Sequence, residues 1–496
     1  MARKPEPVEV GPDRELPEGW AYCSIGDLVR ISSGKYIPKS HYSKDPGKPF
    51  PVAGAGGPIG FTDRSNTSGP ILALGRVGAA GAVTTYPGDA WVTDNVLVLT
   101  PHIESTRRLL AEFLKTVRWS EIQTGSSQPL ITQTLVKALV YPLAPLAEQK
   151  RIVAKVEKLL ERVAAARERL AKVPAILKRL RQSILAAACS GRLTEEWRAA
   201  NASTESAAQA LARLKAVSTS VKTRRGVPDA VFISEAADQF DVPDCWAKES
   251  VAELLKCGGL LDVKDGNHGA NHPKRDDFTT EGLPFITAAQ VSNYSIDYDG
   301  APKVAGKALE RLRVGFAQVN DAVLTHKGTV GRAALNLRPC VLTPQTTYYR
   351  CNAEVLRPDY LVYFMTSSQL YQQMAAVMSQ TTRDFVPISE QYNLFIFLPP
   401  LSEQAEIVRR VESLFRLADE IERRVAVATA RADRLAQAIL AKAFRGELVP
   451  TEAELAAKEG REYESAGELL ERICLKTADT QDRRTAAGRV ASGRPN

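Results

Sequence analysis

The stretch PLAEQKRIVAKVEKL, residues 145–159, returns later in the same chain as PLSEQAEIVRRVESL, residues 400–414. The similarity extends without a gap, so that 145–193 aligns with 400–448, and over two fifths of the aligned positions are identical. An internal repeat of this length indicates a chain built from two related halves. The rest of each half can therefore be compared with its counterpart.

The repeated stretch has the spacing of a heptad helix. In both copies apolar residues follow one another in alternating steps of four and three, which is typical of a coiled-coil seam. Gly191 and Gly446 are expected to end the helices, and Pro174 to kink the first helix or to start a second segment. The two helices are expected to pair with each other. Their direction is open, although an antiparallel pairing would place the segments that precede the two helices at opposite ends of the pair. The seam is assigned to Ile152, Val156, Leu159, Leu180 and Ile184, and to Ile407, Val411, Leu414, Leu435 and Ile439.

A block of a different kind precedes each helix. The blocks open on LPEGWA (16–21) and VPDCWA (242–247), which aligns Trp20 with Trp246. Both alternate glycine-rich turns with short Val, Ile and Leu runs and contain a helical stretch, so both are expected to be mixed α/β domains of one fold. The blocks differ in length, whereas the helices do not. Two copies of one frame with two different blocks are what a two-headed recognition protein requires.

The expected fold class is α+β. Two mixed α/β domains are separated by two long helices that pair as a coiled coil, with a pseudo-twofold internal repeat. The expected segments are a flexible arm (1–15), the first block (16–144), a helical region (145–214), a linker (215–241), the second block (242–399), a second helical region (400–475) and a flexible tail (476–496).

Bulk composition leaves the class of protein broad. The 496 residues include 65 basic and 57 acidic side chains, a net charge of +8. This mild excess permits nucleic-acid binding without demonstrating it. The seven cysteines are scattered with no C-x-x-C pair, so neither a zinc site nor a disulfide framework is expected. Neither a signal peptide nor an apolar run of about 18 residues is found, which predicts a cytoplasmic protein without a membrane partner.

Catalytic and metal-binding patterns are weak. GRVGAAG (75–81) lacks the strand–helix context of a dinucleotide loop, so a glycine-rich hairpin is the better interpretation. Asp262, Asp265 and His268 could form a metal or nuclease site, but no second acidic cluster with a lysine accompanies them. A polar turn or a DNA-contact loop is the favoured reading, and neither a catalytic nor a metal site is assigned.

The doubled frame resembles the specificity (S) subunits of type I restriction-modification systems. The resemblance rests on the Leu-Pro-x-x-Trp opening, the glycine-rich strand block and P-L-x-E-Q-x-x-I-V before a long helix, and it covers nearly the whole chain. It implies two target-recognition domains, each reading one half of a split asymmetric DNA sequence. It also implies helices that dock two adenine methyltransferase (M) subunits, which a nuclease (R) subunit then joins. The chain itself would be non-catalytic and free of cofactors, with S-adenosylmethionine, ATP and Mg in the partner subunits.

Candidate DNA contacts are polar or basic residues in glycine-flanked loops. Lys and Arg suit phosphate or guanine, and Asn and Gln suit adenine. The glutamate and glutamine of P-L-x-E-Q are assigned to methyltransferase binding, although a helix N-terminus also favours acidic residues. The DNA candidates are Lys35, Tyr36, Lys39, Arg76, Ser126, Ser127 and Gln128 in the first block and Lys264, Asn267, His268, Lys274, Arg275, Lys327, Arg332, Gln345 and Arg383 in the second; the partner candidates are Glu148, Gln149, Glu403 and Gln404.

Three alternatives stay open. The chain could be a stand-alone metal-dependent nuclease, a coiled-coil scaffold that binds only proteins, or the same kind of subunit serving a methyltransferase without a nuclease.

In the favoured hypothesis the length of the helices sets the distance between the two half-sites. About 33 residues at ~1.5 Å each span roughly 50 Å, which is the order of one ~34 Å turn of DNA.

Overall fold

The computed structural model describes residues 15–122, 130–202, 204–218, 239–380 and 384–477. The chain divides into two compact units. Unit 1 comprises Met1–Ala171 with Val425–Asn496, and unit 2 comprises Lys172–Arg424. The two long helices, α5 (Leu146–Cys189) and α14 (Leu401–Phe444), each contribute one part to either unit.

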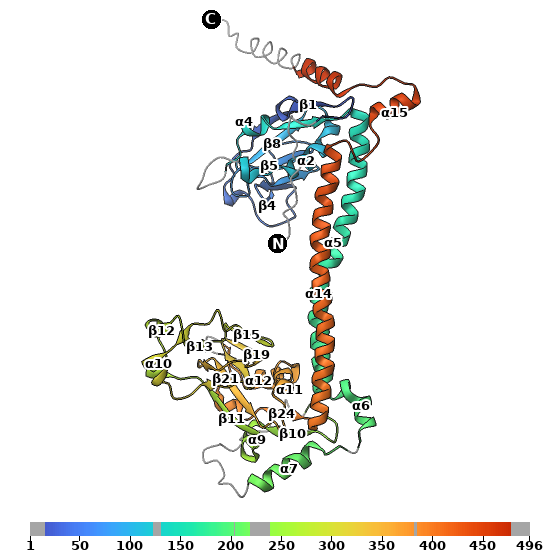
Figure 1. The fold of residues 1–496 in the computed structure, drawn as a ribbon. Helices are drawn as coiled ribbons and strands as arrows, with labels where there is room; N and C mark the ends of the chain where they lie inside the picture. Colours follow the sequence, from blue (N-terminus) through green and yellow to red (C-terminus); the bar gives the residue numbers. More distant parts are fainter. Residues whose placement is uncertain (1–14, 123–129, 203, 219–238, 381–383, 478–496) are drawn as a thin grey trace. The chain divides into compact units, whose positions relative to one another are not determined.

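The strands of unit 1 form the first head, from β1 to β9 (Figure 1). A four-stranded antiparallel sheet has the order β2-β8-β5-β6, a three-stranded sheet has the order β4-β3-β7 with β3 parallel to β7, and β1 pairs with β9. The central strands are continuous apolar runs because both of their faces are buried. Bounds are β1 Ala21–Ser24, β2 Val29–Ser33, β3 Phe50–Gly54, β4 Gly57–Thr62, β5 Ile71–Gly75, β6 Val83–Tyr86, β7 Trp91–Val92, β8 Val96–Pro101 and β9 Val140–Leu143.

The second head, from β10 to β24 in unit 2, repeats this plan. Its main sheet contains β11-β21-β18 with β19 also paired to β18, which is the order of the first head, and β13 is parallel to β20 as β3 is to β7. β10 pairs with β24 as β1 pairs with β9. The two blocks therefore have one fold. Bounds are β10 Ala247–Ser250, β11 Leu260–Asp265, β12 Phe278–Thr279, β13 Leu283–Ile286, β14 Val291–Ser292, β15 Ser295–Ile296, β16 Lys303–Val304, β17 Phe316–Ala317, β18 Ala322–Lys327, β19 Thr329–Leu335, β20 Cys340–Leu342, β21 Thr346–Cys351, β22 Ser379–Gln380, β23 Asp384–Phe385 and β24 Phe395–Leu398.

Short helices complete both units. In unit 1, α2 packs its apolar face into the core that the head shares with the long helices, and residues 466–477 form a further helix. No helix in the described residues is both long and apolar enough to cross a membrane. Bounds are α1 Ile25–Leu28, α2 Arg107–Thr116, α3 Trp119–Ile122, α4 Gln133–Lys137, α6 Glu195–Ala200, α7 Ala207–Ser218, α9 Val251–Cys257, α10 Gly306–Glu310, α11 Pro358–Met365, α12 Ser368–Val377, α13 Ile388–Gln391 and α15 Glu452–Glu459.

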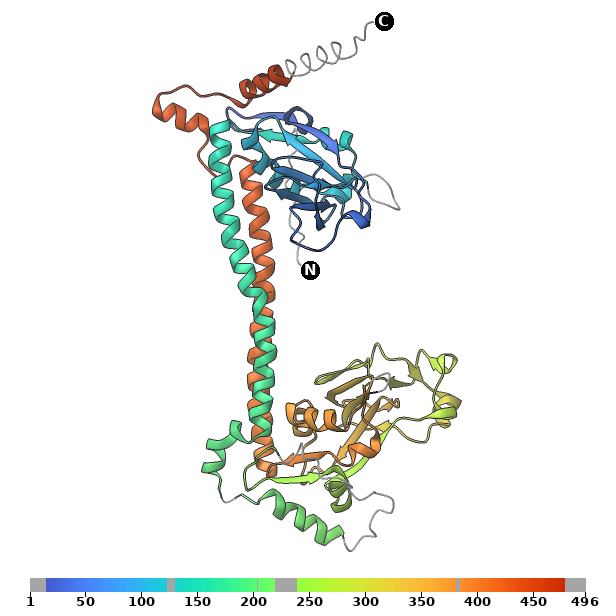
Figure 2. The same ribbon diagram turned by 180° about the vertical axis from the view of Figure 1, so that it is seen from behind.

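The long helices run antiparallel in each unit (Figures 1 and 2). In unit 1 Arg167 pairs with Asp433, and in unit 2 Arg181 pairs with Asp419 at 2.6 Å. As the residue number rises along α5, the number of its partner on α14 falls, which is the register of an antiparallel pair. The predicted fold class, two mixed heads with a paired-helix element, is confirmed. α5 continues through Pro174 as one helix, so no second segment starts there.

The predicted seam is only partly correct. Ile152, Val156, Ile184, Ile407, Val411 and Ile439 are buried, and Leu159 and Leu414 are half-buried. Leu180 and Leu435, however, are 40% and 51% exposed. In α5 one of the two heptad rows is therefore covered, whereas the row that contains Leu159 and Leu180 lies at the border of the helix pair. The covered row of α5 includes Val163 and Leu177, at 7% and 3% exposed.

Candidate nucleic-acid interface

A buried glutamate joins each head to its long helix. In unit 1 the Nε1 of Trp20 donates to Oε1 of Glu148 at 3.1 Å, and the backbone N–H of Glu452 donates to the other oxygen. In unit 2 the Nε1 of Trp246 donates to Oε2 of Glu403 at 2.9 Å. The Pro/Trp opening and the P-L-x-E-Q motif therefore form one joint in each half.

The assignment of this motif to partner binding is wrong for the described conformation. Glu148, Gln149, Glu403 and Gln404 are all 0% exposed. The two glutamines donate to the carbonyl groups of Ala144 at 2.8 Å and Pro399 at 2.9 Å. Burial raises the pKa of Glu148, although hydrogen bonds oppose this shift. The motif seemed available because sequence alone does not show which face of the helix start is covered.

The predicted contacts of the first head gather at one edge of its main sheet. β2 and β5 both lie antiparallel to β8, so both end at the same edge. There Nη1 of Arg76 donates to Oγ of Ser33 at 3.5 Å, and Nε2 of Gln133 donates to the same oxygen at 3.1 Å. Lys35 and Tyr36 follow β2 directly. The edge thus combines a half-buried cation with exposed polar side chains.

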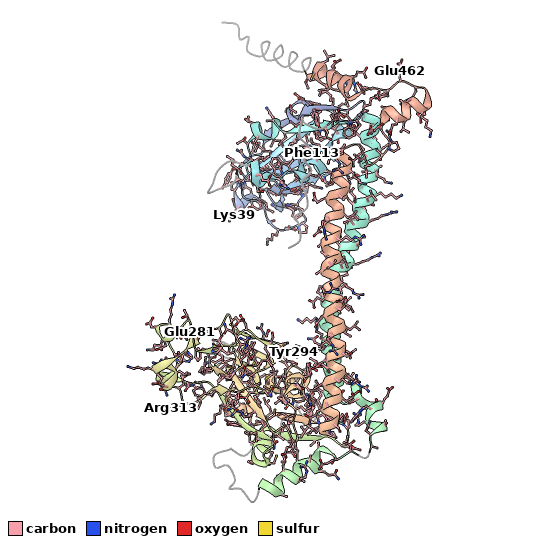
Figure 3. All side chains as sticks on the ribbon, viewed as in Figure 1. Lys39, Phe113, Glu281, Tyr294, Arg313 and Glu462 are labelled. Carbon is pink, nitrogen blue, oxygen red and sulfur yellow. The ribbon has the colours of Figure 1, made fainter. Side chains whose placement is uncertain are left out.

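Three predicted residues of the first head are free to meet a large ligand. Lys35, Tyr36 and Lys39 are exposed, and the Tyr36 ring is 71% exposed. Figure 3 shows Lys39 at the outer side of the first head, whereas Phe113 lies toward the long helices. Basic and aromatic side chains on one outer edge suit a nucleic acid better than an apolar partner.

The second head presents the equivalent edge at the ends of β11 and β18. Nε2 of His268 lies 2.7 Å from Oδ2 of Asp265. Nζ of Lys264 lies 3.9 Å from Asp262, and Nζ of Lys327 lies 5.2 Å from the centre of the Phe385 ring. All three predicted side chains, Lys264, His268 and Lys327, are exposed.

Other predictions for the second head need correction or stay predictions. Asn267 is 2% exposed, and its Oδ1 accepts from the backbone N–H groups of Arg313 and Val314, so it shapes the loop instead of contacting DNA. Gln345 is half-buried, and its Oε1 accepts from the backbone of Ala288 at 3.2 Å. Lys274, Arg275 and Arg332 are exposed. Ser126, Ser127, Gln128 and Arg383 lie outside the described residues.

Sequence reasoning missed Ser33, Gln133 and His326. His326 is 1% exposed and its Nδ1 lies 3.0 Å from the carbonyl oxygen of Val386. Burial lowers the pKa of His326. The sequence around it, HKGTVGRAA (326–334), does not indicate that a residue as distant as Asp265 lies close enough to act on it electrostatically. In the described ranges no three His, Cys, Asp or Glu side chains are grouped so that they could hold a metal ion.

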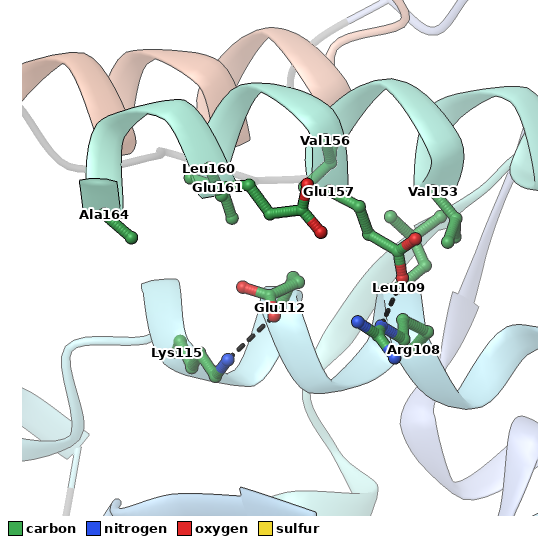
Figure 4. A pocket seen from close by; sticks show the side chains of 10 residues that line it. All are labelled: Arg108, Leu109, Glu112, Lys115, Val153, Val156, Glu157, Leu160, Glu161 and Ala164. Atoms are coloured by element: carbon green, nitrogen blue, oxygen red, sulfur yellow. Dashed lines mark hydrogen bonds and ion pairs between the residues drawn. The ribbon is translucent and has the colours of Figure 1, made fainter. Parts of the chain in front are cut away.

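Two grooves mark the helices of unit 1. The first has a volume of about 300 Å³ and lies between α2 and α5, where Arg108 pairs with Glu157 and Lys115 pairs with Glu112 (Figure 4). The second, of about 450 Å³, lies between α5 and α14. Its lining is mostly apolar, with basic residues among the apolar ones: Leu159, Arg162, Val163, Ala166, Ala432, Leu435, Ala438, Ile439, Lys442 and Leu448.

Comparison with known proteins finds a family model for part of the chain and similar proteins for more than half of it. A family model described as type I restriction modification DNA specificity domain matches residues 17–175. The specificity subunit of the type I restriction enzyme EcoBI from Escherichia coli is 29% identical over 325 residues, which are 64% of this chain and 60% of that subunit. The chain is similar to type I restriction-modification specificity subunits. It therefore spans less than two thirds of the EcoBI subunit in this match.

Another specificity-subunit relative matches over a longer range. The EcoDI specificity subunit of Escherichia coli is 26% identical over 448 residues, 88% of this chain and 90% of that subunit. A chain from a solved structure of type I restriction-modification complex assembly has a TM-score of 0.61 at 20% identity and covers 88% of this chain and 100% of its own. At that identity the likeness establishes the fold.

Proposed function

We propose that this chain is a non-catalytic DNA-recognition subunit that directs a partner adenine methyltransferase to a split, asymmetric target. Each head reads one half of the target on double-stranded DNA. The observation that carries the proposal is that both heads have the same strand order, yet expose different polar side chains at the equivalent sheet edge. Two heads with the same fold but different exposed side chains at this edge suit two half-sites of different sequence.

Affinity and specificity have different sources in this proposal. Exposed lysines such as Lys39 in the first head and Lys274 in the second supply contacts to phosphate, which position the head without reading sequence. Groups at the strand ends, among them Arg76 and His268, supply contacts to base edges in the major groove. Specificity then depends on residues that the fold holds rigidly.

The methyltransferase is proposed to bind the helices through their uncovered apolar residues, not through P-L-x-E-Q. Support comes from the apolar groove between α5 and α14 in unit 1, where Leu435 is 51% exposed. Arg162 and Lys442 in its lining favour an acidic amphipathic surface on the partner. The same helices would set the spacing between half-sites, so longer helices should lengthen the unread spacer.

The remaining partners follow the family resemblance. Two methyltransferase subunits and a nuclease subunit are proposed to assemble with this chain. S-adenosylmethionine, ATP and Mg would be bound by those partners. A methyltransferase without a nuclease partner would need the same specificity chain, so the proposal holds for either system.

Long-read methylation mapping of the host genome, with and without this gene, tests the function. We expect one split adenine-methylation motif to disappear on deletion and to return when the gene is restored. Every motif persisting while the partner methyltransferase is expressed would contradict the proposal. Cleavage of DNA by the purified chain with Mg²⁺ alone would favour the nuclease alternative instead.

The docking site is tested with Leu435→Asp in the full chain co-expressed with the methyltransferase. We expect the charge in the apolar groove to reduce co-purification of the two proteins at least about tenfold. Leu475→Asp is the matched control, because Leu475 is also exposed, at 73%, but lies outside the groove. Equal co-purification by both variants would place the docking surface elsewhere.

A further inference from the structure

The strand registers identify matching residues in the two heads. Ser33 faces the central strand β8 as Asp265 faces the central strand β21, at the last position of β2 and β11. One residue later each head has a glycine, which is Gly34 in the first head and Gly266 in the second. A Cβ at either glycine would overlap a carbonyl oxygen, of Thr93 or of Leu342, so the backbone passes this point only as glycine.

An exposed aromatic ring follows each glycine at the same distance. It is Tyr36 in the first head and His268 in the second, and both are exposed. The backbone before Tyr36 is held firmly: Lys35 donates its N–H to Val92 O at 2.9 Å, and the Trp91 indole donates to Lys35 O at 3.0 Å. A large exposed ring on a fixed backbone loses little entropy when it binds.

A second pair of positions matches beneath these rings. The backbone N–H of Arg76 donates to Asn95 O at 2.9 Å, and that of His326 donates to Gln345 O at 3.0 Å. Arg76 directly follows β5 and His326 is the penultimate residue of β18, and each of these strands pairs with the central strand of its head. Within the described residues, Nε of Arg76 and Nε2 of His326 are buried and have no hydrogen-bond partner.

Asp265 determines which hydrogen bond His268 can offer. Its carboxylate lies 2.7 Å from Nε2 of His268, so Nε2 carries the proton and donates. Nδ1 is then the ring nitrogen that is left to accept a hydrogen bond. Burial lowers the pKa of His326, so this nearby ring stays neutral and does not take Asp265 as an ion-pair partner.

We propose that Tyr36 and His268 are the matched base-reading residues of the two heads, and that His268 accepts a hydrogen bond from the amino group of adenine or cytosine. This inference rests on the proposed DNA-recognition function. In the major groove the N6 amino group of adenine and the N4 amino group of cytosine are the donors that such an acceptor can reach. Tyr36, which offers a ring and a hydroxyl, reads its half-site by different chemistry, so the two halves need not match.

The test uses the full chain in complex with its methyltransferase. Binding is measured on the mapped target and on duplexes in which each base pair of the target is replaced in turn. His268→Ala should lower discrimination at one position of one half-site about five- to tenfold, the effect of losing one hydrogen bond. Tyr36→Ala should lower discrimination at one position of the other half-site only.

Asp265→Asn tests whether Asp265 acts by setting which nitrogen of His268 carries the proton. An amide at this position can donate to Nε2 of His268, which moves the ring proton to Nδ1 and turns the acceptor into a donor. We expect the base preference to weaken or change at the same position that His268→Ala affects. Lys274→Ala is the control: as an exposed lysine of the same head, it should weaken binding to all duplexes alike.

A wrong assignment of Tyr36 and His268 and a wrong DNA-recognition function would give different binding results. Uniform weakening by His268→Ala and Tyr36→Ala, or no change at all, would overturn the assignment of these two residues while the wild-type complex still selected its split target. A wild-type complex with no sequence preference on any duplex would instead overturn the proposed function itself.

Discussion

The indole Nε1 of Trp246 donates a hydrogen bond of 2.9 Å to Oε2 of Glu403, where the second head meets the start of α14. The hydroxyl of Thr194 and the guanidinium of Arg198, which follow α5, bind the other carboxylate oxygen at 2.7 and 2.6 Å. One buried carboxylate thus joins the head, α14 and the segment after α5 within unit 2. Unit 1 repeats the arrangement around its own glutamate.

Removing this carboxylate should destabilise unit 2 strongly. In Glu403→Ala the Arg198 cation loses its carboxylate partner and keeps the carbonyl of Gly191, while the Trp246 N–H loses its acceptor, at an expected cost of about 3 kcal/mol. Urea denaturation of the full chain measures the loss. Glu420→Ala is the control, because Glu420 lies on the same helix but forms exposed ion pairs with Arg423 and Arg424. Equal stability of the two variants would contradict the role of Glu403.

Gly446 should tolerate no side chain. Its φ is +71°, and an added Cβ would lie 2.5 Å from Cγ of Pro17. Gly460→Ala provides a matched comparison, since Gly460 has a φ of +65° but nothing within 4 Å of the added carbon. We expect Gly460→Ala to cost about 1 kcal/mol for the left-handed backbone and Gly446→Ala to cost clearly more. Thermal unfolding of both variants decides; a Gly446→Ala midpoint at or above that of Gly460→Ala would refute the contact.

Truncation of two leucines of α5 should cost different amounts of stability, because one is buried in the helix pair and the other is exposed. Leu177 is 3% exposed, whereas Leu180, three residues later, is 40% exposed. Leu177→Ala should therefore cost about 3 kcal/mol of folding free energy and Leu180→Ala less than about 1 kcal/mol. Both substitutions replace Leu by Ala in the same helix, so they change helix propensity equally. The difference between their free energies of unfolding, measured with denaturant, therefore reports the difference in packing. A larger loss for Leu180→Ala would mean that the register of the helix pair is wrong.

The stability of unit 1 should depend on pH through Glu148. Burial raises the pKa of this carboxyl above the 4.5 of a free glutamate, so the folded chain holds the proton more tightly than the unfolded chain. The resulting stabilisation is complete below pH 4.5 and is lost as pH rises through the raised pKa. Glu148→Gln, which carries no titrating proton, should flatten this part of the pH profile of the urea midpoint. An unchanged profile would show that Glu148 does not titrate in this range.

Much of the architecture could be predicted from local patterns. Heptad spacing in two aligned copies predicted the paired helices, and the glycine-rich apolar runs predicted two mixed heads of one fold. Gly191 and Gly446 were expected to end the helices, and both adopt a positive φ just beyond the last helical turn. Such features follow from residues close together in the sequence, which is why the pattern alone reveals them.

The candidate site could be predicted only in outline. Exposed Lys35, Tyr36 and His268 were found because polar residues beside glycine suggest loops. The burial of Asn267 was missed, because its hydrogen bonds go to a loop almost fifty residues away. Likewise the likeness of Arg76 to His326 has no trace in residue type and emerges only when strand registers are compared.

The internal repeat, the helix pair and the two blocks follow from local sequence patterns, because hydrophobic periodicity and turn residues act over short distances along the chain. Which side chains become buried depends on the tertiary fold. Glu148 and Glu403 became internal joints, and Leu180 and Leu435 became surface, because burial depends on what a distant segment packs against. The pairing of strands that are far apart in the sequence likewise placed His326 near Asp265, whereas Asp265 and His268 are only three residues apart along the chain.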